Sequence, residues 1–134
     1  MTIIEALVGK TSPEQLLINV PKLLTANFDL LSDPKIGAPR VAFGTSGHHG
    51  NASEYSFNEL HELYICQVIC EYRKTLDING PMYFGIDTHA LPELAFEMVL
   101  EVVAVNGIET MIAMGDEYTS TPAVSHEILM RRTS

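Results

Sequence analysis

Apolar residues recur three and four positions apart after Ser56-Phe57-Asn58-Glu59, and this spacing predicts a helix. Ser56 with Glu59 three residues later has capping-box spacing, so we expect the helix to begin there and to end near Thr75. The stripe expected to face the core consists of Leu60, Leu63, Tyr64, Val68, Ile69 and Tyr72.

Further helices are predicted on both sides of this one. Pro92 can open a helix because its missing amide is not needed in the first turn, and Asn106-Gly107 can close it. Pro21 interrupts an N-terminal helical pattern and divides it into two short pieces. The full set of additional helices is expected over 13–19, 21–28, 92–105 and 122–130, with a connecting loop over 30–40.

Short apolar runs between these helices predict strands. Residues 82–86 show no polar alternation, which is typical of a fully buried strand. A short buried strand is also predicted over 41–43, and 108–114 is predicted as the strand that follows the Pro92 helix. Strands alternating with helices indicate an α/β fold, here a three-layer domain with a mixed, mostly parallel sheet flanked by helices. Ligands of such sheets bind at the carboxyl ends of the strands, where this chain places its polar and glycine-rich loops.

Composition narrows the classes of function. The chain has 134 residues, of which 46% are hydrophobic, and we expect them to form one domain over 1–134. A net charge of −9 disfavours nucleic acid and anionic membrane surfaces as partners. No segment approaches the roughly 20 apolar residues of a membrane span, and no export signal precedes the domain, so a cytoplasmic location is expected. Cys66 and Cys70 lie four apart on a helix, and a buried structural role is predicted for both.

The segment 44–50, Gly-Thr-Ser-Gly-His-His-Gly, is the first candidate binding site. Glycines let backbone amides approach an anion, and Thr45, Ser46, His48 and His49 can donate to phosphate oxygens. The alternative is a tight turn whose hydroxyls bond to their own backbone. The spacing fits neither a Walker A loop nor a dinucleotide fingerprint, and Ser46 lacks the third group that would orient a neighbouring base.

Asp87-Thr88-His89 follows a predicted strand and is the second candidate. These residues could contact a ligand, or they could form the turn ahead of the Pro92 helix. His48, His49, Asp87 and His89 could meet if both loops lie at one end of the sheet, but no metal site is predicted for this chain.

Four segments resemble bacterial phosphoglucomutases of the phosphohexomutase superfamily, in order and in spacing. They are VAFGTSGHHG (41–50), SFNELHELYICQVI (56–69), GIDTHALPELAFEMVLEVVAVNG (85–107) and TSTPAVSHEIL (119–129). The resemblance covers 15–129, leaves 1–14 as an N-terminal extension, and implies the fold of the family's domain I. It also implies a four-domain isomerase of carbohydrate metabolism, which interconverts glucose 1-phosphate and glucose 6-phosphate by intramolecular phosphotransfer through a phosphoserine and bound magnesium.

The resemblance assigns this chain a supporting part in that site. Thr45 and Ser46 resemble residues that line the active site, and Asp87-Thr88-His89 resembles a loop near the same cleft. Many relatives have Arg at the position of His49, and imidazole is a weaker partner for phosphate than a guanidinium.

The family's catalytic Ser-His-Asn-Pro segment is absent from these 134 residues, and its magnesium and sugar loops belong to later domains. We therefore expect no catalytic residue and no cofactor here, and no turnover by the chain alone. Expected partners are glucose phosphates, bound weakly or not at all, and either the remaining mutase domains or a second copy at an exposed sheet edge. The alternative is a stand-alone phosphate-binding or regulatory docking module derived from a mutase.

Overall fold

The computed structural model describes residues 8–29, 41, 43–44, 47–89, 91–115 and 117–131. In chain order the elements of these residues are the short 3-10 helix η1 (Glu14–Leu16), α2 (Val20–Asp29), the short 3-10 helix η2 (Ala52–Glu54), α3 (Glu59–Thr75), β1 (Met82–Tyr83), α4 (Pro92–Val105), β2 (Thr110–Met111) and α5 (Thr121–Arg131). Among them, no helix is both long and apolar enough to cross a bilayer.

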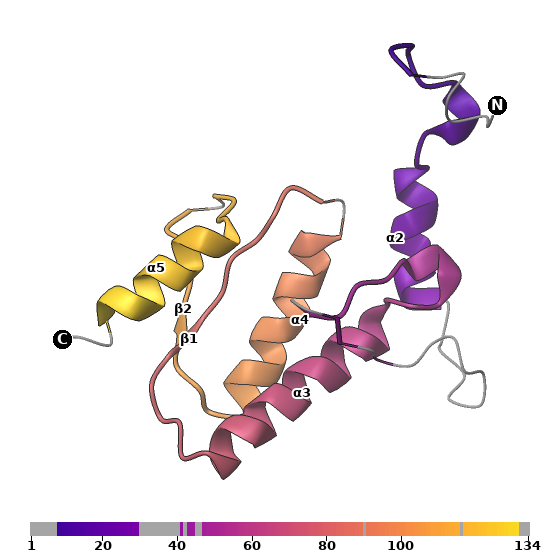
Figure 1. Cartoon of the computed structure of the whole chain (residues 1–134). Helices are drawn as coiled ribbons and strands as arrows, with labels where there is room; N and C mark the ends of the chain where they lie inside the picture. The colour runs from indigo at the N-terminus through magenta and orange to yellow at the C-terminus, as the bar shows by residue number, and fades with distance from the viewer. Residues whose placement is uncertain are drawn as a thin grey trace.

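The two strands form a parallel pair between helices. Met82 is opposite Thr110 and Tyr83 is opposite Met111. Helices α3 and α4 lie on one side of the pair and α5 lies on the other (Figure 1). The predicted α/β fold with parallel strands between helical layers is therefore confirmed.

Both strands are shorter than predicted, and β1 is less buried. The ladder covers two residues of each strand, although the Phe84 amide also donates to the Met111 carbonyl at 3.0 Å. Met82 and Tyr83 are half-buried, so the prediction of a fully buried strand over 82–86 is wrong. The physical reason is that the described sheet has two strands, so each has one edge without a strand beside it.

The apolar core lies between α3, α4 and β1. Cys66, Cys70 and Val103 are buried together, which confirms the predicted burial of the two thiols. The partly buried residues packed against this cluster are Met82, Phe84, Val99, Val102 and Ile108.

The buried face of α3 is not the face that the apolar spacing predicted. Tyr64, Val68 and Tyr72 of the predicted core stripe are 64%, 60% and 62% exposed. The face that meets α4 instead carries Cys66 and Cys70. The small thiol side chains let the two helices approach closely, which the tyrosines would prevent.

The ends of the helices correct two further predictions. Asn58, not Ser56, caps α3, because its Oδ1 accepts from the His61 amide at 3.3 Å. The predicted helix over 13–19 is reduced to η1, whereas α2 tolerates Pro21 because the proline lies in its first turn. Helices α4 and α5 lie where the sequence predicts them, and the expected loop over 30–40 falls outside the described residues.

Candidate functional site

The glycine-rich segment forms a turn that closes on itself. The Gly44 amide donates to the Gly47 carbonyl at 2.8 Å, and Phe43 and His48 form an isolated antiparallel bridge. Gly47 has a φ of 149°, in the region that favours glycine. Thr45 and Ser46, two of the predicted site residues, lie outside the described residues.

The predicted buried strand over 41–43 is wrong for its described residues. Val41 is 40% exposed and Phe43 is 65% exposed. The reason is that the bridge from Phe43 runs back to His48 within the same turn and not to β1 or β2.

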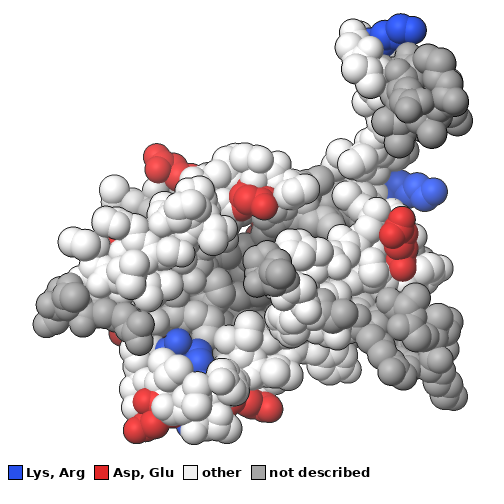
Figure 2. All heavy atoms as spheres, in the orientation of Figure 1, with Lys and Arg blue, Asp and Glu red and all other residues white. Residues whose placement is uncertain are grey.

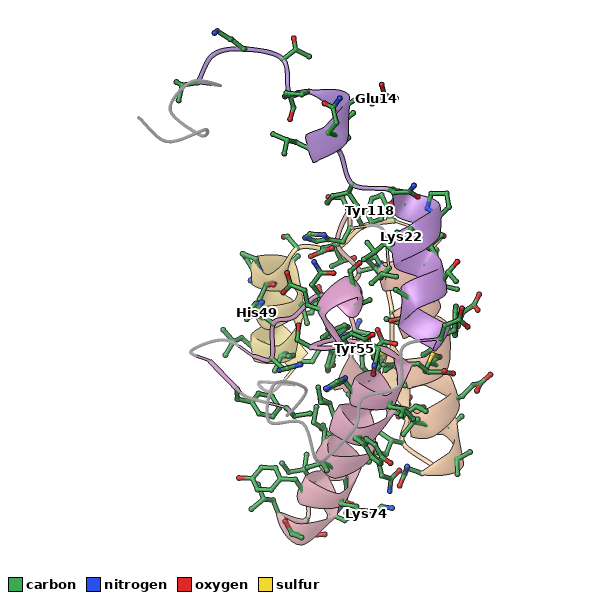
Figure 3. The ribbon with its side chains drawn as sticks, turned by 90° about the vertical axis from the view of Figure 1, so that its right-hand side faces the viewer. Glu14, Lys22, His49, Tyr55, Lys74 and Tyr118 are labelled. Atoms are coloured by element: carbon green, nitrogen blue, oxygen red, sulfur yellow. The ribbon has the colours of Figure 1, made fainter. Side chains whose placement is uncertain are left out.

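His48 is turned toward the start of α3. Its Nε2 lies 2.7 Å from the Ser56 carbonyl oxygen, and its ring stacks on Phe57 and His61. His49 is exposed, and in Figure 3 it stands to one side of η2 while α2 stands to the other. The two adjacent histidines therefore have different surroundings, and a phosphate contact remains a prediction for both.

The turn that follows the loop is built from short polar side chains. The Asn51 side chain accepts from the Ser53 amide at 2.9 Å, and the Asn51 amide donates to Ser56 Oγ at 2.8 Å. A Cβ on Gly50 would overlap the Ser56 carbonyl. This close approach fixes the end of the glycine-rich loop against the segment that leads into α3.

The second predicted segment is an exposed turn. Asp87 Oδ1 accepts from the His89 amide at 2.9 Å, which is the geometry of an Asx turn. Asp87, Thr88 and His89 are all exposed. The sequence left open whether this segment forms a turn or contacts a ligand. The geometry confirms the turn, and ligand contact remains a prediction.

The loops after β1 and β2 are joined to each other. The Thr119 amide donates to the Ile86 carbonyl at 2.7 Å. Gly85 makes room for this, because a Cβ there would lie 2.8 Å from the Thr119 carbonyl oxygen and 2.8 Å from Val124 Cγ2. The start of α5 is thereby held against the carboxyl end of β1.

A cavity of about 360 Å³ opens at the same end of the sheet. Its lining includes Phe84, Phe96 and Tyr118, and three carboxylates, Glu93, Glu97 and Glu117. The carboxylates oppose the entry of a phosphate group. On the face drawn in Figure 2, the basic side chains of the described residues do not gather into a patch that would offset them.

A second group of titratable and polar residues is buried where α2 meets the start of α3. Asn27 of α2 is 1% exposed and Glu62 of α3 is 5% exposed. Burial raises the pKa of Glu62 from 4.5 to about 7, Glu59 adds to the rise, and Asn27 partly opposes it. Within the described residues, the side-chain polar atoms of Asn27 and Glu62 have no hydrogen bond of normal geometry. Sequence reasoning missed this pair, because neither residue belongs to a recognisable motif.

The described part of the chain offers no set of donor atoms that fits a magnesium ion, which the family resemblance implies for the whole enzyme. No group of three or more His, Cys, Asp or Glu side chains there has a metal-binding arrangement. In particular, His48, His49, Asp87 and His89 do not form such a group.

Comparison with known proteins places these loops in a family. Residues 40–133 match the family model of phosphoglucomutase/phosphomannomutase, alpha/beta/alpha domain I. The chain is 48% identical over 129 residues to a phosphoglucomutase from Komagataeibacter xylinus, covering 96% of this chain and 23% of that protein. The chain thus spans about a quarter of the length of this curated relative. We conclude that the chain belongs to the phosphoglucomutase/phosphomannomutase family and carries its alpha/beta/alpha domain I.

Proposed function

We propose that this chain is the first domain of a phosphoglucomutase, an isomerase that interconverts glucose 1-phosphate and glucose 6-phosphate by intramolecular phosphotransfer. The observation that carries the proposal is the identity of 48% with a phosphoglucomutase over 96% of the chain. We place this activity in carbohydrate metabolism and in the cytoplasm, and we take residues 1–134 as a single domain with 1–14 as its extension.

The part that we assign to this domain is to border the phosphate of the substrate. The glycine-rich loop supplies the donors: the hydroxyls of Thr45 and Ser46 and the exposed imidazole of His49. The cavity beside Glu93, Glu97 and Glu117 is a poor alternative, since its carboxylates repel phosphate. Asp87, Thr88 and His89 would approach the same cleft from the end of β1.

The transferring groups come from elsewhere in the proposed enzyme. These 134 residues contain no Ser-His-Asn-Pro segment, so we assign the phosphoserine to another part of the polypeptide. Magnesium would neutralise phosphate charge during transfer, and we place its ligands in that other part as well. The 134 residues alone are therefore proposed to be inactive and to work together with further mutase domains.

A chimera tests this proposal. In it, this chain replaces the matching 129 residues of the Komagataeibacter xylinus phosphoglucomutase, and glucose 6-phosphate formation from glucose 1-phosphate is measured with a coupled assay. We expect turnover by the chimera and none by the 134 residues alone. A folded chimera without activity would contradict the proposal and would favour a separate binding or docking module.

A substitution in the chimera tests the loop itself. His49→Ala removes one donor to a charged phosphate, and we expect kcat/KM to fall about tenfold, which corresponds to about 1.4 kcal/mol. Lys22→Ala is the matched control, because Lys22 is exposed on α2 outside the loop. Equal activities for the two variants would remove His49 from the proposed site.

A further inference from the structure

Three aromatic rings connect the glycine-rich loop to the first turn of α3. The centroid of the His48 ring lies 5.6 Å from that of Phe57 and 5.5 Å from that of His61, with interplanar angles of 18° and 15°. Nearly parallel rings at these separations form offset stacks, which fix ring orientation as well as distance. His61 is only 3% exposed, so it offers the stack a rigid base.

Hydrogen bonds determine where the ring protons lie. Asn58 Oδ1 lies 2.8 Å from His61 Nδ1 and also accepts from the His61 amide. Because an amide oxygen can only accept, His61 Nδ1 must carry a hydrogen. The same reasoning applies to His48, whose Nε2 lies 2.7 Å from the Ser56 carbonyl oxygen and must donate to it.

These contacts connect the start of α3 to the glycine-rich loop and restrain the position of that loop. Asn58 is 1% exposed and is the cap of α3, so its side chain is immobilised by the helix that it begins. Asn58 orients the His61 ring, and the His61 ring supports His48. His48 in turn belongs to the turn closed by Gly44 and Gly47.

We propose that His61 is a positioning residue of the glycine-rich loop: anchored by Asn58, its ring holds His48 and so fixes the path of residues 47–50. His49, the next residue, then stays exposed for a ligand. This role deepens the proposed function, since the loop is the segment proposed to border phosphate. The ring contacts themselves do not depend on that function.

The first test needs no substitution. Nitrogen-15 NMR of the imidazole rings in the 134-residue chain at pH 8 is expected to show His61 protonated at Nδ1 and His48 protonated at Nε2. The Nε2 proton of His48 is expected to be visible, because a hydrogen bond slows its exchange with water. The opposite tautomer at either ring would overturn the proposal.

Two substitutions separate positioning from general stability. His61→Phe keeps an aromatic ring beside His48 and loses the bond to Asn58, whereas His61→Ala removes the ring. We expect the Nε2 proton signal of His48 and the amide shifts of 47–50 to be lost or strongly displaced in His61→Ala, and to be retained with a smaller displacement in His61→Phe, whose ring lacks the bond to Asn58. His126→Ala, at an exposed position of α5, is the control and is expected to leave these signals unchanged.

The outcomes are distinguishable from those of the proposed function. Unchanged His48 signals in a folded His61→Ala would overturn the positioning role, as would a complete loss of the His48 Nε2 signal in a folded His61→Phe, because the ring contact would then contribute nothing. If His61→Ala does not fold, the proposal is tested by the tautomers of the wild-type chain and by the His48 signals of His61→Phe. Titration with glucose 1-phosphate is a separate measurement, and a lack of binding there would count against the phosphate site while leaving the ring assignments intact.

Discussion

The two ends of α3 are packed in opposite ways. Toward its C-terminal half, Cys66 and Cys70 are buried with Val103 in an apolar cluster. At its first turn, the buried side chains are His61 and Glu62, and Asn58 lies buried just before it. One helix thus joins a region held by apolar burial to a region held by polar contacts.

The difference shows which region sets the position of the glycine-rich loop. Apolar packing resists changes of volume but imposes no direction on its partners. Hydrogen bonds and ring stacks at the polar end do impose direction, and they reach His48. The polar end also lowers the stability of the fold, because Asn27 and Glu62 are buried without hydrogen bonds of normal geometry in the described part of the structure.

The largest predicted effect comes from placing a polar group in the apolar region. Val103→Asn puts an amide where the side chain is 0% exposed, and we expect it to lower the free energy of unfolding by about 4 kcal/mol. Urea denaturation of the purified chain measures this. The control is Val105→Asn on the same helix, where the side chain is 89% exposed and little change is expected. Equal effects at 103 and 105 would contradict the assignment of the core.

The polar region is predicted to make stability depend on pH. The pKa of Glu62 is about 7 in the folded chain because of burial and the charge of Glu59, against 4.5 as its ordinary value. Between these values the folded chain holds a proton that the unfolded chain has lost, so stability falls as pH rises from 4.5 to 7 and this contribution levels off above 7. The loss attributable to Glu62 is about 3 kcal/mol.

Glu62→Gln cannot ionise and is expected to abolish this part of the pH dependence. Unfolding free energies measured by urea denaturation between pH 4.5 and 8 would show it. Glu101→Gln, at an exposed position of α4, is the matched control and should retain the wild-type slope. A wild-type slope in Glu62→Gln would show that the buried carboxyl does not hold its proton.

A smaller effect is predicted where the glycine-rich loop meets the polar end of α3. In Gly50→Ala the new Cβ would overlap the Ser56 carbonyl and lie 2.8 Å from Phe57 Cβ, so the backbone must shift. We expect a loss of about 1.5 kcal/mol in unfolding free energy, with displaced ring signals of His48. Gly80→Ala has nothing within 4 Å of the added atom and should behave as wild type. Undisturbed His48 signals in Gly50→Ala would mean that the loop does not follow this path.

The sequence predicted the helices of the apolar region better than their packing. The Pro92 and Asn106-Gly107 signals correctly bounded α4, which spans Pro92–Val105. The apolar spacing in α3 correctly indicated a helix, but it did not reveal which face is buried. Tyr64 and Tyr72 share one face and Cys66 and Cys70 share another, and only the contact with α4 distinguishes them.

The polar region was predicted less completely, for a different reason. The glycine spacing correctly indicated a turn over 44–50, since tight backbone geometry is a local property. The stack of His48 on His61 joins residues thirteen positions apart through side chains, and no local pattern encodes it. The signal that was available is Asn58 three residues before His61, the spacing at which a helix cap reaches a first-turn amide.

The smallest predicted effect concerns a buried titratable group in the apolar region. Burial, with the neighbouring Cys70, raises the pKa of Cys66 from 9.0 to about 12, and its Sγ lies 3.8 Å from the Val99 carbonyl oxygen. Folded and unfolded chains both keep this thiol protonated below pH 8, and its contribution to stability is lost only as pH rises above 9.

Cys66→Ala is therefore expected to leave the pH dependence of unfolding unchanged between pH 5 and 8, even if it lowers stability uniformly through lost packing. The same series of urea denaturation curves used for Glu62→Gln measures this. A changed slope in Cys66→Ala would mean that the apolar cluster and Glu62 are coupled, and the two ends of α3 would then act as one unit. An unchanged slope would assign the pH response to the polar end and not to Cys66, because the same physical cause, burial, moves the pKa of Glu62 into the neutral range and moves the pKa of Cys66 further above it.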